Sequence, residues 1–277
     1  MNKIIVPIDF SDYSEYALQA AASLAKKNDA EILALHMLEL SDFMLTISGS
    51  ALDEQTVFYL KMAEKKFHEF LDKPYLEGIE VTPIVKHFKS FVEVSEIAKE
   101  HNADLIVMGS HGTHGLQEMF VGSNTEKVVR HSEIPVLIIK EELKSVGFDN
   151  VVFACDFSDE AIPAYKKATK ILSELGGQLH ILYVNQPAER FRSSDEIENK
   201  LKEFLTKADC NTDNFKNVAI TNAYTVEHGI FAYADKTSAD LLAVATYGRT
   251  GIAHFFEGSI SEDVANHAKL PVLTFKI

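Results

Sequence analysis

The sequence predicts an α/β protein made of two similar domains, each a doubly wound parallel sheet with helices on both faces. Near the start, residues 6–12 read VPIDFSD, and residues 153–159 return as FACDFSD. Short apolar runs alternate with amphipathic stretches through both halves, which is typical of a parallel sheet covered on both faces. A length of 277 residues suits two domains. We assign them to residues 1–141 and 148–277, on either side of a polar linker.

The first half is expected to alternate strands and helices. The apolar run at 3–8 ends at Asp9 and is interpreted as a buried strand. Asp12 and Glu15 have capping-box spacing, and apolar residues follow them on one helical face as far as Leu24, which predicts a helix. The later strands are expected at 32–38, 81–87, 105–108 and 136–139, and the later helices at 53–70, 92–100 and 123–131.

The second half is expected to repeat this order. Its strands are predicted at 151–155, 179–184, 218–223, 241–245 and 272–276, and its helices at 161–175, 195–207, 228–236 and 259–267. The repeat offset is 147 residues from Asp9 to Asp156 but 136 from Gly122 to Gly258. Since 147 − 136 = 11, the first copy carries 11 extra residues. We expect them within residues 40–54, as a candidate lid or surface insertion.

Composition limits the classes of partner and the compartment. The formal net charge of −14 divides into −8 for residues 1–140 and −6 for the remainder. Two acidic halves repel nucleic-acid phosphates and anionic lipid, so neither is an expected partner. The two cysteines, Cys155 and Cys210, form no CxxC motif, which suits a reducing cytoplasm. The N-terminal apolar run is too short for a signal peptide, and no run reaches the roughly 20 residues of a membrane span.

Two conspicuous motifs are expected to meet at one edge of the sheet. Asp9 ends the first strand, and the glycine loop that starts at Gly109 and includes Gly112 follows the fourth. In open parallel sheets, ligands bind at the carboxyl ends of strands near the switch in strand order. Glycines there leave backbone N–H groups open to a phosphate chain. Gly122 and Ser123 then open a helix, whose N-terminus favours anions. The pattern predicts a phosphate cradle.

Structural roles explain some of the same residues equally well. Ser123 and Ser259 each precede a glutamate at capping-box spacing, so each serine could simply cap its helix. Asp9 and Asp156 could be turn formers at strand ends. Ala245 stands where the first copy has Gly109, so the second copy of the loop has lost a glycine.

Several familiar signatures are missing. The sequence has no GxxxxGK[ST] loop, no GxGxxG after the first strand and no GxSxG elbow. His111 and His114 lie three apart in the glycine loop, but a zinc site needs more ligands, so we expect no resident metal. The aspartates of the repeated DFSD motif could hold Mg²⁺ together with substrate phosphates.

These motifs resemble the universal stress protein family in its tandem form. The resemblance rests on Asp9-Phe-Ser and on Gly109-x2-Gly112-x9-Gly122-Ser123, and it covers essentially the whole chain. It implies that each half is a Rossmann-like domain with a five-stranded parallel sheet, similar to the adenine-nucleotide alpha-hydrolase fold. It also implies that the last strands of the two domains pair, which would make an internal pseudo-dimer, and it allows a further homodimer.

The resemblance implies ATP as ligand, with Mg²⁺ only as part of the nucleotide complex. Asp9 would contact adenine or ribose, the Met37 backbone the adenine edge, and the glycines and helix start the phosphates. The implied nucleotide site comprises Pro7, Asp9, Met37, Gly109, Gly112, Gly122, Ser123 and Asn124. The matching candidate site in the second half comprises Asp156, Val184, Gly248, Gly258 and Ser259.

The function that these observations favour is a cytoplasmic stress-response and signalling protein that binds ATP in its first domain without efficient catalysis. The reason is a phosphate cradle with no evident general base, arginine finger or P-loop lysine. One alternative is a slow ATP-hydrolysing enzyme, for which His111 and His114 are the candidate acid or base. Another is a nucleotide-free interaction scaffold. The sequence does not identify the protein partner or the stress that is sensed.

Overall fold

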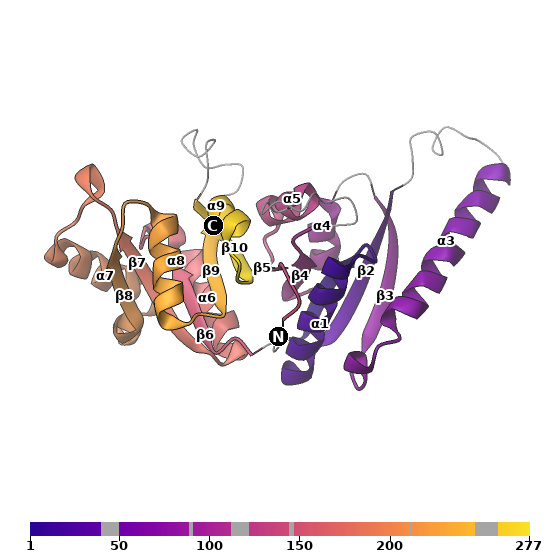
Figure 1. Ribbon diagram of the computed structural model, residues 1–277, viewed down its shortest axis with the longest axis horizontal. Helices are drawn as coiled ribbons and strands as arrows, with labels where there is room; N and C mark the ends of the chain where they lie inside the picture. Colours follow the sequence, from indigo (N-terminus) through magenta and orange to yellow (C-terminus); the bar gives the residue numbers. More distant parts are fainter. Residues whose placement is uncertain (40–49, 89–90, 112–121, 144–146, 211, 247–259) are drawn as a thin grey trace. The chain divides into compact units, whose positions relative to one another are not determined.

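The computed structural model describes residues 1–39, 50–88, 91–111, 122–143, 147–210, 212–246 and 260–277 (Figure 1). Strands and helices alternate along the chain, so the predicted α/β class is confirmed. Part of the expected insertion, residues 40–49, lies outside the described residues. Residues 50–54 form the beginning of a long helix.

The predicted order of elements is confirmed in the first half, with bounds mostly within two or three residues of those expected. The strands are β1 (Lys3–Ile8), β2 (Glu31–Glu39), β3 (Val81–Phe88), β4 (Leu105–Gly109) and β5 (Val136–Ile139). The helices are α1 (Asp12–Asn28), α3 (Ser50–Leu71), α4 (Glu93–Glu100) and α5 (Ser123–His131), with a 3-10 turn, η1 (Pro74–Leu76), before β3.

The second half follows the same order. Its strands are β6 (Asn150–Ala154), β7 (Gln178–Asn185), β8 (Val218–Asn222), β9 (Leu241–Thr246) and β10 (Val272–Lys276). Its helices are α6 (Ile162–Leu175), α7 (Ser194–Asp209), α8 (Val226–Thr237) and α9 (Ile260–His267). The sequence did not predict its 3-10 turns, which are η2 (Asp159–Ala161), η3 (Ala188–Arg190) and η4 (Asp213–Asn217).

The start of α1 corrects one prediction. The N-cap is Ser11, whose hydroxyl accepts a hydrogen bond from the Ser14 N–H at 3.2 Å. The capping box expected at Asp12 and Glu15 is therefore wrong. Serine and aspartate are both good N-cap residues, so the sequence alone does not decide between neighbours. The extended backbone of Ser11 (φ −83°, ψ 164°) decides in its favour.

Both halves have the same strand order and register. The order is β3-β2-β1-β4-β5 in the first and β8-β7-β6-β9-β10 in the second. Among the described residues, every pairing whose register is defined is parallel. Ile4 pairs with Leu105 in the first half, and Val151 pairs with Leu241 at the matching positions of the second. The duplication seen in the sequence is therefore a duplication of the sheet.

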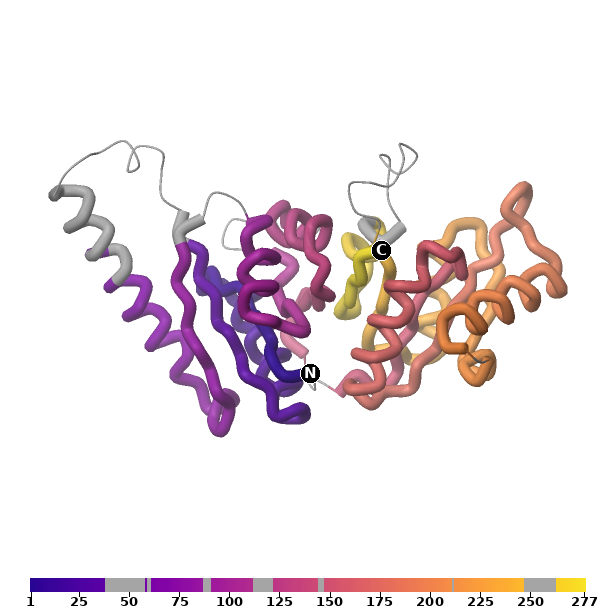
Figure 2. Tube along the Cα trace, turned by 180° about the vertical axis from the view of Figure 1, so that it is seen from behind, coloured from indigo at the N-terminus to yellow at the C-terminus, as the bar shows by residue number. Residues whose placement is uncertain are grey.

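Helices cover both faces of each sheet, as expected for a doubly wound fold. Figures 1 and 2 view the molecule from opposite sides, and they show α6 and α8 on opposite faces of the second sheet. The central strands are buried on both sides: Ile4, Ile5, Val6 and Ile106 are fully inaccessible to solvent. Continuous apolar runs of this kind are what a two-sided sheet requires.

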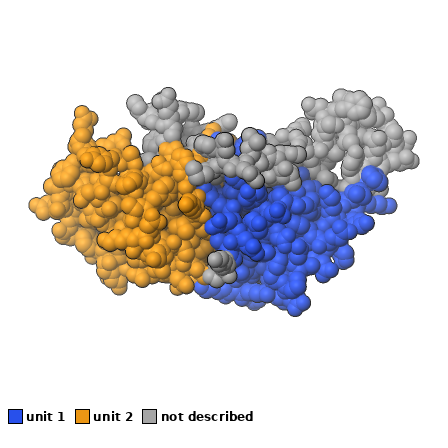
Figure 3. Space-filling model, viewed as in Figure 1, with its two compact units in different colours: residues 1–117, 122–128, 138–146 blue, residues 118–121, 129–137, 147–277 orange. Residues whose placement is uncertain are grey.

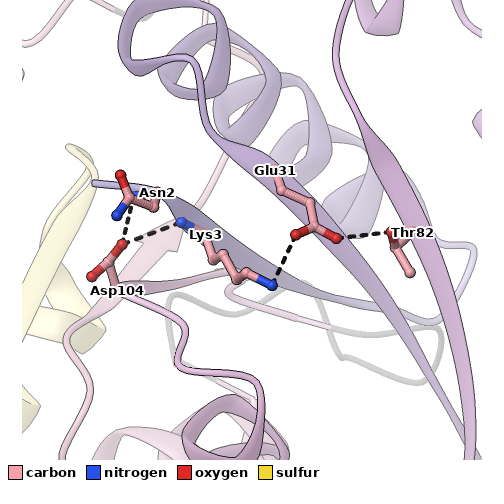
Figure 4. Close-up of polar contacts among 5 residues, drawn as sticks. All are labelled: Asn2, Lys3, Glu31, Thr82 and Asp104. Carbon is pink, nitrogen blue, oxygen red and sulfur yellow. Dashed lines mark hydrogen bonds and ion pairs between the residues drawn. The ribbon is translucent and has the colours of Figure 1, made fainter.

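An aspartate ties the first and fourth strands together at their amino ends in both halves. Asp104 Oδ2 accepts from the backbone N–H groups of Asn2 at 2.5 Å and Lys3 at 3.2 Å (Figure 4). The matching Asp240 accepts from the backbone of Asp149 and Asn150. These hydrogen bonds lie at the amino ends of the strands, so the carboxyl ends remain available for a site.

The chain folds into two compact units, which Figure 3 shows in blue and orange. The first comprises Met1–Gln117, Gly122–Val128 and Ile138–Val146; the second comprises Glu118–Val121, Val129–Leu137 and Gly147–Ile277. Within the described part of the chain, no helix combines the length and apolarity needed to cross a membrane.

Candidate functional site

The carboxyl end of β1 lies at the switch point of the first sheet. β1 pairs with β2 on one side and with β4 on the other. The chain runs outward from β1 in both directions, so helices leave β1 and β4 toward opposite faces. The prediction that the strands ending at Asp9 and Gly109 are neighbours across this point is confirmed.

Asp9 forms a tight turn at the end of β1. Its Oδ1 accepts from the backbone N–H of Ser11 at 3.0 Å and from the Ser11 hydroxyl at 2.5 Å. In the second half, Asp156 Oδ1 accepts from the Ser158 N–H at 3.0 Å. Both aspartates are therefore turn formers, the structural role that the sequence left open. A carboxylate has about four acceptor positions, so this role is compatible with binding a ligand.

The phenylalanine that follows each aspartate has an unusual backbone. Phe10 has φ = 64° and Phe157 has φ = 55°, in the left-handed region. For a residue with a side chain this conformation costs roughly 1–2 kcal/mol. The Phe10 ring packs on His36 with centroids 4.6 Å apart and on Phe67 with centroids 5.5 Å apart. Aromatic pairs contribute about 0.5–1.5 kcal/mol each beyond the area that they bury, enough to offset the backbone cost.

Gly109 is a glycine because the helix that follows β1 passes very close to it. A Cβ at this position would lie 2.7 Å from the Tyr13 carbonyl oxygen and 2.8 Å from the Tyr13 Cβ. The sequence pattern suggests that this glycine gives a phosphate chain access to the backbone. The packing against α1 requires it whether or not a ligand binds.

The second half changes the helix start at the matching point. α1 begins at Asp12, whereas the corresponding Asp159 opens the 3-10 turn η2, and α6 begins only at Ile162. The loss of the first motif glycine, to Ala245, thus accompanies a change in the helix that packs on that glycine in the first half.

Gly122 brings the start of α5 against the end of β4. Its N–H donates to the Ser110 carbonyl at 2.6 Å, and a Cβ here would lie 3.1 Å from the same oxygen. One turn later, the buried Thr125 hydroxyl donates to the Gly109 carbonyl at 2.8 Å. Sequence reasoning missed Ser110 and Thr125, because a short polar residue gives no signal of which carbonyl it will meet.

The first turn of α5 carries the predicted phosphate-binding residues. α5 begins at Ser123, directly after Gly122. Ser123 and Asn124 are both exposed. The first four N–H groups of a helix have no partner within the helix, and its N-terminus has positive dipole character. This turn can therefore bind an anion.

Pro7 and Met37 lie on the strands beneath the site. Pro7 is buried in β1, opposite Leu35 of β2. Met37 is 8% exposed near the end of β2. The matching Val184 packs against α8 at Gly229, where a Cβ would lie only 2.6 Å from the Val184 Cγ1. Asp156 is exposed. The remaining predicted residues lie outside the described residues: Gly112, His114, Gly248, Gly258 and Ser259.

Two histidines are held close to the site. His36 Nδ1 lies 2.7 Å from the Ile8 carbonyl, which can only accept, so Nδ1 carries the hydrogen. Burial lowers the pKa of His36 below its usual value of 6.5. His111 Nδ1 lies 2.9 Å from the Ser110 hydroxyl, and its ring lies beside that of Tyr13, tilted by 44°, with the centroids 5.2 Å apart. In the described part of the chain, no group of three or more acidic, histidine or cysteine side chains could hold a metal ion.

Comparison with known proteins gives one consistent result. The universal stress protein family matches residues 1–140 and again residues 147–276. The chain is 35% identical over 150 residues to Universal stress protein MJ0531 from Methanocaldococcus jannaschii, covering 52% of this chain and 84% of that protein. It is 35% identical over 148 residues to Universal stress protein YxiE from Bacillus subtilis, covering 50% of this chain and 99% of that protein.

A solved structure extends the similarity to the whole chain. The crystal structure of a universal stress protein from Archaeoglobus fulgidus matches with a TM-score of 0.76 and 25% identity, over 99% of this chain and 98% of that chain. The two curated relatives each cover about half of this chain, and the family matches it twice in succession. The chain therefore belongs to the universal stress protein family, as a tandem of two family domains.

Proposed function

We propose that the first domain binds ATP, with Mg²⁺ accompanying the nucleotide, and that the protein signals stress through nucleotide occupancy without efficient catalysis. The observation that carries the proposal is the contact between Gly122 and Ser110. It brings the first turn of α5 to the end of β4, next to the strand that ends at Asp9. An acceptor for the adenosine end and amides for the phosphates then occupy one edge of one sheet.

Different residues of the proposed site bind different parts of the nucleotide. Asp9 takes the adenine or ribose end, and the backbone of Met37 takes the adenine edge. The amides at Gly122, Ser123 and Asn124 hold the terminal phosphates, which also supply most of the ligands for Mg²⁺. The exposure of Ser123 and Asn124 supports this role, because a phosphate can reach them without displacing the core.

Isothermal titration of the full chain with Mg-ATP tests the proposal. Asp9→Asn keeps an oxygen that can accept from Ser11, so the turn persists while the charge is lost. Asp9→Ala loses both. Hydrogen bonds to charged groups contribute about 1.5–3 kcal/mol, so we expect Asp9→Ala to weaken binding roughly 10- to 150-fold. Wild-type protein that gives neither heat nor a thermal shift with excess Mg-ATP refutes the first-domain site.

The second domain serves as the matched control. Asp156→Asn makes the same change in the matching turn, and its effect on the binding stoichiometry reports whether a second site contributes.

We also propose that the last strands of the two domains pair within one chain. The unpaired Cys155 and Cys210 support our assignment of the protein to a reducing cytoplasm.

Slow ATP hydrolysis is the alternative that one observation favours. His111 is the titratable side chain that follows β4 directly, and both Ser110 and Tyr13 hold its ring. Phosphate release that disappears in His111→Ala would support an enzyme. Release at the rate of buffer alone, in protein that binds nucleotide, supports a binding protein instead.

A further inference from the structure

We propose that Phe10 is a positioning residue: a ring cluster beneath the end of β1 fixes its left-handed backbone and thereby aims the Asp9 carboxylate at the ligand. This inference rests on the proposed function. Phe10 has no place in the proposed contacts with nucleotide. Its role is to set the direction of the residue before it and of the helix after it.

The contacts around Phe10 come from two other elements. His36 on β2 lies 4.6 Å from the Phe10 ring, and Phe67 and Phe70 on α3 each lie 5.5 Å from it, edge to face. Lys66, also on α3, lies over the same ring at 5.4 Å from its centroid. Phe67 is 3% exposed, so this part of the cluster belongs to the packed interior. The ring of Phe10 therefore reaches down between β2 and α3.

A ring held in this way constrains the turn above it. The backbone at Phe10 has φ = 64°, and the residues on either side, Asp9 and Ser11, are joined by two hydrogen bonds. Ser11 in turn caps α1. A residue other than glycine keeps a left-handed backbone conformation only where the surrounding structure holds it. If the ring loses its partners, the backbone can relax and the Asp9 carboxylate swings away from the site.

The same arrangement occurs independently in the second domain. Phe157 has φ = 55° and is 3% exposed. Its ring packs edge to face on Phe204 of α7 at 5.1 Å and against Tyr183 of β7 at 6.0 Å. Tyr183 occupies the position that His36 has in the first domain. Both copies therefore hold an aspartate turn over a ring from the second strand and a phenylalanine from the following long helix.

The test uses ring-to-leucine changes, which remove the aromatic ring but keep a large apolar side chain. Phe67→Leu alters the cluster without touching the turn, and Phe10→Leu alters the anchor itself. Phe153→Leu is the matched control for Phe67→Leu, because its ring is likewise buried but packs on Tyr165 and Phe275 in the second domain. Titration with Mg-ATP, adenosine and tripolyphosphate separates the two ends of the ligand. Hydrogen exchange of the Ser11 amide reports the turn without any ligand.

The expected result is selective. Phe10→Leu and Phe67→Leu bind adenosine and ATP about tenfold more weakly, bind tripolyphosphate as wild type does, and exchange the Ser11 amide about tenfold faster. Phe153→Leu changes none of these. Unchanged adenosine binding with unchanged Ser11 exchange overturns the inference, and so does an equal loss for all three probes, because that indicates general destabilisation. If wild type binds no probe, the proposed function fails, and the Ser11 exchange rate alone decides the positioning role.

Discussion

Ser123→Asp separates anion binding from fold stability more sharply than any deletion of a side chain. Ser123 is the first residue of α5 and is exposed, so a carboxylate there meets no packed neighbour. Negative charge in the first turn of a helix is favoured by about 0.3–1 kcal/mol, because it opposes the positive end of the helix dipole. The variant should therefore fold at least as stably as wild type.

The same carboxylate should repel a bound triphosphate. A charge about 5 Å from a phosphate, at an effective dielectric constant between about 20 and 80, costs roughly 1–3 kcal/mol per charge pair. That energy corresponds to binding of Mg-ATP weakened about 5- to 150-fold. Ser123→Asn, which is neutral and of similar size, is the control and should bind close to wild type. Adenosine, which carries no phosphate, should bind all three proteins equally.

Calorimetric titration at two salt concentrations checks this reasoning. The Debye length falls from about 10 Å at 0.1 M salt to about 3 Å at 1 M. The difference between Ser123→Asp and wild type should therefore shrink at high salt. Equal affinity of the two proteins for Mg-ATP at low salt would refute the placement of phosphates at the start of α5.

Two further predictions concern stability. Gly109→Ala should destabilise the protein by about 1–3 kcal/mol, because the new Cβ would lie 2.7 Å from the Tyr13 carbonyl oxygen. Ala245→Gly, at the matching position of the second domain, should cost only roughly 0.5–1 kcal/mol. Urea unfolding measures both changes in the free energy of unfolding, and equal effects would contradict the packing explanation. His36 has a folded-state pKa below the unfolded value of 6.5, so its contribution to stability is complete above that pH and is lost as pH falls toward the folded pKa. His36→Tyr, which copies Tyr183, should flatten the pH dependence of unfolding below pH 6.5, and an unchanged slope would be evidence against this linkage.

The sequence predicted the sheet well because its signals are local. Each strand is a short apolar run, and the repeat places Asp9 and Gly109 at strand ends whatever the details of packing. The general topology of doubly wound sheets predicts that these two strand ends lie side by side. The two possible roles of Ser123, as a helix cap or as a phosphate ligand, are not distinguished by such local signals, because its position as the first residue of α5 suits either.

The backbone at Phe10 could not have been predicted in this way. A positive φ is expected at glycine or asparagine, and no local pattern marks a phenylalanine for it. Its cause lies in His36 and Phe67, which are 26 and 57 residues further along the chain. At Gly109 the sequence suggests a ligand role where packing gives a sufficient reason. A glycine beside a candidate site suggests access for a ligand, but a Cβ there would meet the backbone of α1.

Comparison of the two domains shows which parts of the motif are shared structural features. Both domains keep the aspartate turn, the left-handed phenylalanine and the clamp made by Asp104 or Asp240. These features stabilise the fold in each copy, so the repeated DFSD motif is weak evidence for a ligand by itself. The approach of Gly122 to Ser110 involves another element, because it brings the exposed first turn of α5 to a strand end. Nucleotide binding in the first domain must therefore be tested at the start of α5, and changes at the aspartate turn need a control for stability.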